Sequence, residues 1–175
     1  MKRFEVRISG LGGQGVVLAG QVLGKAAVYD GKNAVQTQSY GAEARGSMAK
    51  SEVIIADSKI GYPEVRKCDI LIAMSQEALD KNLKDLKKSG ILLVDSTCVK
   101  KIPETTAKIF KVDATENAQK ICGSKIYANM LMLGALTTAT CITTEEAMKK
   151  AIEDTIAKNG TSINKQAYGE GEKLI

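Results

Sequence analysis

The sequence contains no histidine, no tryptophan and only five tyrosines and two phenylalanines. Without histidine, the commonest general base is missing and neither a Ser-His-Asp triad nor a Cys-His pair can form. The few aromatic side chains offer no stacking platform for bases, so we expect no nucleic-acid partner. We therefore predict that this chain carries no catalytic residue of its own.

Long apolar runs are also missing. No run approaches the roughly 18 residues that a membrane-spanning helix requires, and the opening segment MKRFEVRISG lacks the apolar stretch of a signal peptide. We expect a cytoplasmic protein with no membrane association. The net charge of +5 suits an anionic small ligand or an acidic partner.

The four cysteines are scattered and form no C-x-x-C pair. Such spacing favours neither a zinc site nor an iron–sulfur cluster, so we expect no metal site. Free cysteines are commonly buried, and we expect most of these to be reduced and buried.

Strand-like and helix-like patterns alternate along the chain with no compositional break. We expect strands at 4–9, 34–39, 48–56, 68–75, 90–97 and 107–113, and helices at 15–29, 76–88, after 113, from 129, at 144–158 and around 164–168. Ser75, an Asp113–Glu116 box and a Thr143–Glu146 box are the predicted helix caps. This alternation predicts a Rossmann-like, doubly wound α/β fold with a mostly parallel sheet, in a single domain over 1–175.

A glycine loop follows the first predicted strand. Gly10, Gly12 and Gly15 form G-x-G-x-x-G where a helix begins, so backbone N–H groups and the positive end of the helix dipole favour an anion there. A tight turn that binds nothing has the same pattern. NAD is disfavoured because the second strand ends VQTQS, without the acidic residue that bonds the ribose, while Asp30 is typical of a turn. A different phosphate-bearing ligand is the better hypothesis.

Several motifs together resemble one family. GLGGQGVVLAGQVLGKAA, VQTQSYGAEARGS and DILIAMSQEAL, followed by GILLVDST, NMLMLGAL and INKQAYGEG, resemble the gamma subunit of thiamine-diphosphate-dependent 2-oxoacid:ferredoxin oxidoreductases. The segment TQSYGAEARG is more similar to the 2-oxoglutarate type than to the pyruvate type. The chain departs from many relatives at Ser47–Met48, where those carry a further glycine and small residues.

The resemblance implies a reaction shared between subunits. A 2-oxoacid, coenzyme A and oxidised ferredoxin would give an acyl-CoA, carbon dioxide and reduced ferredoxin. Thiamine diphosphate, magnesium and 4Fe–4S clusters would lie on alpha, beta and ferredoxin-like delta partner subunits, and ferredoxin would be reached through the complex. This chain would be inactive alone, would help form the coenzyme A site, and could form a homodimer when isolated.

The resemblance also implies the site residues. Gly12, Gly13, Gln14 and Gly15 would hold the phosphates of coenzyme A through backbone N–H groups, and Arg45 would add positive charge. The other interpretation of Arg45 is a loop arginine paired with Glu43. Two further residues would bond the ligand's amides or, alternatively, cap helices; they are Asn129 and Asn164.

Three alternatives stay open at this point. The substrate could be pyruvate, a branched-chain 2-oxoacid or indolepyruvate, because partner subunits would set that choice. The chain could instead be an independent NAD- or FAD-binding domain. It could also be an assembly subunit whose glycine loop is empty.

Overall fold

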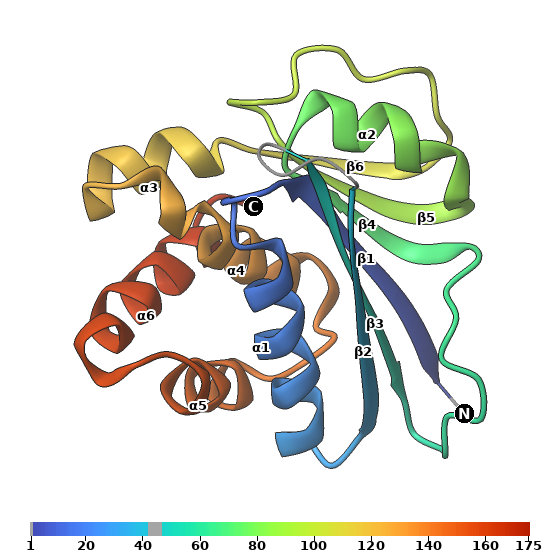
Figure 1. Cartoon of the computed structure of the whole chain (residues 1–175), viewed down its shortest axis with the longest axis horizontal. Helices are drawn as coiled ribbons and strands as arrows, with labels where there is room; N and C mark the ends of the chain where they lie inside the picture. The colour runs from blue at the N-terminus through green and yellow to red at the C-terminus, as the bar shows by residue number, and fades with distance from the viewer. Residues whose placement is uncertain (1, 42–46) are drawn as a thin grey trace.

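One six-stranded sheet runs through the protein, with helices on both of its faces (Figure 1). The computed structural model describes residues 2–41 and 47–175. The strands are β1 (Arg3–Leu11), β2 (Asn33–Tyr40), β3 (Met48–Ala56), β4 (Cys68–Ala73), β5 (Leu86–Asp95) and β6 (Lys108–Val112). The α-helices are α1 (Val16–Tyr29), α2 (Gln76–Asn82), α3 (Ala114–Cys122), α4 (Ala128–Thr140), α5 (Glu145–Thr155) and α6 (Lys158–Glu172), with short 3-10 helices η1 (Leu83–Asp85) and η2 (Lys125–Tyr127).

The sheet order is β2-β3-β1-β4-β5-β6. The β1–β4, β4–β5 and β5–β6 pairs are parallel, whereas β3 pairs antiparallel with both β1 and β2. A segment as short as the one between β2 and β3 can join antiparallel neighbours but cannot make a parallel crossover. The predicted doubly wound, mostly parallel α/β fold is confirmed, and β3 lies between β1 and β2.

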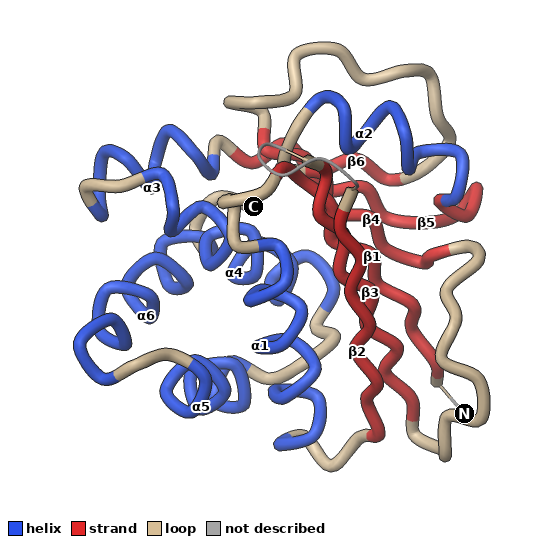
Figure 2. The backbone as a smooth tube through the Cα atoms, in the orientation of Figure 1, coloured by secondary structure: helices blue, strands red, loops and turns tan. Residues whose placement is uncertain are grey.

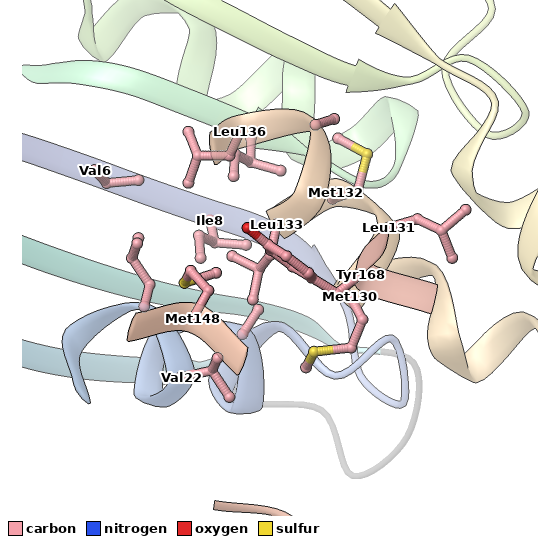
Figure 3. Close-up of a cluster of buried hydrophobic side chains, with 14 of the residues drawn as sticks. Val6, Ile8, Val22, Met130, Leu131, Met132, Leu133, Leu136, Met148 and Tyr168 are labelled. Atoms are coloured by element: carbon pink, nitrogen blue, oxygen red, sulfur yellow. The ribbon is translucent and has the colours of Figure 1, made fainter. Parts of the chain in front are cut away.

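The two faces of the sheet are covered unequally (Figure 2). Helices α1, α4, α5 and α6 pack together on one side, and α2 lies on the other. The larger core contains Val6 and Ile8 of β1, Val22 of α1, Met148 of α5 and Tyr168 of α6, around the α4 side chains (Figure 3). Because α4 is enclosed by both the sheet and the other helices, its residues 128–137 are all buried and mostly apolar.

Two predicted element boundaries were wrong. The helix expected over 76–88 ends at Asn82, because Leu86 already pairs with Cys68 as part of β5. The helix expected around 164–168 is the much longer α6, whose first turn includes Asn159 and Gly160, the predicted end of the preceding helix. In both places tertiary contacts override the local propensity that suggested the boundary.

Of the predicted caps, Ser75 is confirmed, since its side chain accepts from the N–H of Ala78. The cap of α5 is Thr144 rather than Thr143. Asp113 makes no side-chain cap bond to α3; instead Asp95, at the end of β5, accepts from the N–H of Thr115. A buried carboxylate from another element therefore does what a local capping box would do.

No helix in the part of the chain that the structure describes has the length and apolar character to cross a membrane.

Candidate functional site

The glycine loop, residues 10–15, leads from the carboxyl end of β1 into α1. Gly13 and Gly15 have φ of +91° and +72°, which only glycine adopts without steric cost. Gly15 is the residue immediately before α1, so the loop presents the amino end of a 14-residue helix. This is the geometry in which main-chain N–H groups and the helix dipole attract an anion.

Gln14 fixes the shape of this loop from inside. Its side-chain Oε1 accepts from the N–H of Leu11 at 2.7 Å, and its Nε2 donates to the carbonyl of Met74 at 2.8 Å. The side chain thus connects the end of β1 to the end of β4. Gln14 is a positioning residue here, since both ends of its amide are engaged within the protein.

The expectation that all four loop N–H groups face a ligand was too broad. The N–H of Gly12 donates to Ser47 O at 2.8 Å, and the N–H of Gln14 donates to Leu11 O at 3.1 Å. Among residues 2–41 and 47–175, by contrast, no acceptor takes the N–H of Gly13, Gly15 or the first three residues of α1, Val16 to Leu18. These are the donors left for an anion.

Two hollows flank the loop, and Gly13 lines both. One, of about 240 Å³, is lined by Gly13, Gln14, Cys98, Thr115, Lys125, Ile126 and Ala128. The other, of about 280 Å³, lies over the start of α1 and is lined by Leu11, Gly12, Gly13, Gly15, Val16, Val17, Leu18, Tyr40 and Ala49. A Cβ placed on Gly13 would meet no atom of the described residues within 4 Å, so this part of the chain leaves the loop backbone open to a ligand at Gly13.

Lys125 is a site residue that the sequence did not reveal. It lies in η2, which the fold places beside the loop although more than 100 residues separate the two. Lys125 is exposed, and it is the one charged residue among the described residues that line this hollow. A lysine before an apolar helix is too common in sequences to have indicated this role.

Asn129, in the first turn of α4, lies against the glycine loop. It is 2% exposed, its Nδ2 donates to Gly15 O at 3.1 Å, and its Oδ1 accepts from the N–H of Met130 at 2.9 Å. The alternative that Asn129 is an N-cap was wrong, because Tyr127 occupies that position. Asn129 therefore binds the carbonyl of Gly15, and both polar atoms of its side-chain amide are already hydrogen-bonded within the protein.

Asn164 is placed differently. It lies within α6, where its Nδ2 donates to Gly160 O at 2.7 Å, so it is no N-cap either. Neither hollow beside the loop is lined by it. Arg45, with Glu43, lies outside the described residues.

The cysteines do not gather. All four thiols are free; Cys68 alone is buried, and Cys141 is exposed, so the expectation that most are buried was wrong. Within the described ranges, no three His, Cys, Asp or Glu side chains come together as metal ligands would.

Comparison with known proteins identifies the family of this chain. Residues 5–174 match the pyruvate ferredoxin/flavodoxin oxidoreductase family. The 2-oxoglutarate synthase subunit KorC of Methanocaldococcus jannaschii is 48% identical over 175 residues, which span 98% of this chain and 94% of the relative.

Solved structures agree with that assignment. The gamma subunit of a keto/oxoacid ferredoxin oxidoreductase from Geobacter sulfurreducens superposes with a TM-score of 0.87 at 42% identity, over 98% of this chain and 97% of that one. A 2-oxoglutarate:ferredoxin oxidoreductase from Magnetococcus marinus, solved with 2-oxoglutarate, coenzyme A and succinyl-CoA bound, shares the fold. Its TM-score is 0.89 at 22% identity, over 99% of this chain and 31% of the larger one. The chain belongs to the pyruvate ferredoxin/flavodoxin oxidoreductase family.

Proposed function

We propose that this chain is the gamma subunit of a 2-oxoglutarate:ferredoxin oxidoreductase. The complex would convert 2-oxoglutarate, coenzyme A and oxidised ferredoxin into succinyl-CoA, carbon dioxide and reduced ferredoxin. The observation that carries the proposal is the 48% identity to a KorC subunit over nearly the full length of both chains. The TQSYGAEARG segment supports the same substrate type.

Within that complex, the glycine loop would bind the phosphates of coenzyme A. The free N–H groups of Gly13 and Gly15 and the amino end of α1 supply donors and positive potential. Lys125, which lines the adjoining hollow, would supply a full positive charge. The open face of Gly13 lets a bulky pyrophosphate approach the backbone, which a side chain there would prevent.

The rest of the reaction would belong to the other chains. Thiamine diphosphate, when bound on the partner subunits, supplies the decarboxylation chemistry, and their iron–sulfur clusters carry the electrons. Gln14 and Asn129 would act in this chain by holding the loop in its binding shape. The chain would therefore be active only in a cytoplasmic complex with alpha, beta and delta subunits.

The first experiment is anaerobic co-purification of the tagged native chain, followed by mass spectrometry and assay with 2-oxoglutarate or pyruvate. We expect thiamine-binding and iron–sulfur subunits in fixed ratio and coenzyme-A-dependent reduction of ferredoxin with 2-oxoglutarate. Preference for pyruvate would keep the subunit role but replace the substrate. A chain that is always recovered alone would contradict the proposal, and binding of NAD would then be measured.

A matched pair of variants tests the coenzyme A site in the assembled enzyme. Asp and Asn both tolerate the positive φ of Gly13, so Gly13→Asp and Gly13→Asn differ mainly in one negative charge. We expect Gly13→Asp to raise the KM for coenzyme A at least about 10-fold above that of Gly13→Asn, equivalent to about 1.4 kcal/mol. KM values equal to that of the wild type in both variants, or unchanged acyl-CoA formation in both, would favour an empty loop with an assembly role.

A further inference from the structure

The glycine loop lies between two hollows that differ in chemistry. Figure 1 shows the loop at the amino end of α1, with α3 on one side and the end of β2 on the other. Gly13 lines both hollows, so a ligand held at the loop can extend into both. The side chains of each hollow then indicate which end of the ligand it receives.

The hollow on the α3 side carries the positive charge. Lys125 lines it and forms no ion pair within residues 2–41 and 47–175. Cys98 Sγ and Thr115 Oγ1, which are 3.5 Å apart, add polar groups, and Ile126, 57% exposed, adds apolar surface. An ammonium group is a compact charge that suits a phosphate. This hollow therefore favours a ligand end that combines a phosphate with a ring system.

The hollow on the β2 side is apolar. Its side chains come from the ends of β1 and β2 and from the starts of α1 and β3, and they are Leu11, Val16, Val17, Leu18, Tyr40 and Ala49. No charged residue lines it among those that the structure describes. The Tyr40 side chain is 62% exposed, so a ligand that covers its ring removes apolar surface from water. This hollow therefore favours an uncharged, largely apolar segment.

A third hollow, which Tyr40 also lines, does not provide a competing phosphate site for a ligand at the loop. Four basic residues line it, namely Arg7, Lys50, Lys81 and Lys84. It lies on the other face of the sheet, because Ala49 packs in the core with α1 and the next residue, Lys50, points to the opposite face. Arg7 and Lys50 are moreover already paired with Glu52.

Coenzyme A has one end of each kind. On one side of its pyrophosphate lies adenosine with a 3′-phosphate, and on the other lies the pantetheine arm, which carries methyl groups, methylene chains and no charge. We propose that the 3′-phosphoadenosine end lies in the hollow of Lys125 and the pantetheine arm in the hollow of Tyr40, with the pyrophosphate at Gly13 between them. The inference rests on the proposed function. It adds the direction in which the ligand crosses the loop and the residue that meets each end.

Equilibrium binding to the assembled enzyme, measured by calorimetry, tests this direction. The ligands are coenzyme A, 3′-dephospho-coenzyme A, and 3′-phosphoadenosine 5′-diphosphate, which lacks the pantetheine arm. Lys125→Gln should weaken binding of coenzyme A and of the nucleotide about 3- to 10-fold, because both carry the 3′-phosphate, and should leave binding of the dephospho form unchanged. An equal loss for coenzyme A and its dephospho form, or no loss for any ligand, would overturn the proposal.

Substitution of Tyr40 should affect a different pair of ligands. Tyr40→Ala should weaken binding of coenzyme A and of its dephospho form about 10-fold, since both carry the pantetheine arm, and should leave binding of the nucleotide unchanged. Tyr62→Ala is the matched control, because Tyr62 is 63% exposed and lines neither hollow beside the loop. It should bind all three ligands as the wild type does.

Two results with Tyr40→Ala would overturn the proposal. A loss of nucleotide affinity would show that the adenosine end lies on the β2 side. Affinities equal to those of Tyr62→Ala for all three ligands would show that the ligand does not contact Tyr40. A wild-type complex that assembles but binds none of the three ligands would instead contradict the proposed function.

Discussion

Asn129 and Gly15 are 114 residues apart in sequence, yet the Nδ2 of Asn129 donates to the carbonyl of Gly15 at 3.1 Å. A Cβ on Gly15 would lie 2.3 Å from that same nitrogen. The first turn of α4 thus rests directly on the residue that opens α1. The glycine loop is therefore shaped by packing between two helices as well as by its own backbone.

Gly15→Ala should cost far more stability than Gly31→Ala. Both glycines have φ near +73°, but a Cβ on Gly31 would have no atom of residues 2–41 and 47–175 within 4 Å. Gly31→Ala should lower the free energy of unfolding by about 1–2 kcal/mol, the cost of a left-handed alanine. Gly15→Ala adds a steric clash, for a total of about 3 kcal/mol or more. Urea denaturation measures both.

The same clash provides a control for that prediction. Asn129→Ala combined with Gly15→Ala should recover part of the loss, because the smaller side chain leaves room for the new methyl group. Equal costs for the two single glycine variants would show that the contact with Asn129 is looser than the structure has it.

Lys125→Gln should weaken coenzyme A binding in the assembled enzyme. The substitution keeps a polar side chain, one atom shorter, and removes the charge from the hollow that Lys125 and Gly13 both line, so we expect the KM for coenzyme A to rise about 3- to 10-fold with little change in kcat. The difference from wild type should shrink at high ionic strength. Lys120→Gln, on α3, is the matched control. An unchanged KM for coenzyme A in Lys125→Gln would contradict the assignment of Lys125 to the site.

Arg7→Met should be strongly destabilising. Arg7 is buried on β1 and bridges Glu52 and Asp85, both at 2.7 Å. Removing the guanidinium takes away the buried partner of both carboxylates and leaves Glu52 and Asp85 only the more exposed Lys50 and Lys67, which costs about 3–5 kcal/mol. Arg66, an exposed arginine beside Glu64, gives the comparison, and Arg66→Met should cost less than about 1 kcal/mol. Similar denaturation midpoints would contradict this interpretation.

Cys68 should make stability fall at alkaline pH. Burial raises the pKa of its thiol from an ordinary 9.0 to about 11, so the folded chain holds this proton more tightly than the unfolded chain. The resulting stabilisation is complete below about pH 9 and is lost as the pH rises toward 11. Its size is on the order of 1–3 kcal/mol.

Urea denaturation of wild type and Cys68→Ala from pH 8 to pH 11 isolates that contribution, because other titrating groups are common to both. The stability difference between the two proteins should narrow as the pH rises. A constant difference would mean that the thiol is not protected by burial. Alkylation adds a check, since exposed Cys141 should react long before Cys68.

Local patterns in the sequence were enough for the parts of the site that are local. The glycine spacing between a strand and a helix predicted the loop, and Ser75 was recognisable as a cap because its partner, Ala78, is three residues away. Long-range partners were not recognisable. Asp95 caps α3 from another element, and Lys125 joins the loop from beyond α3. Such partners leave no periodic or spacing signal.

The sequence by itself determined the alternation of strands and helices, the anion-favouring loop and the absence of histidine chemistry, since each depends on residue types and short spacings. Only the tertiary structure decided that β3 runs antiparallel between β2 and β1. It also decided that the N–H groups of Gly12 and Gln14 donate to acceptors within the protein. It alone placed β2 at the edge of the sheet. Strand order and hydrogen-bond partners depend on which surfaces meet when the whole chain packs. A short segment of sequence does not contain this information.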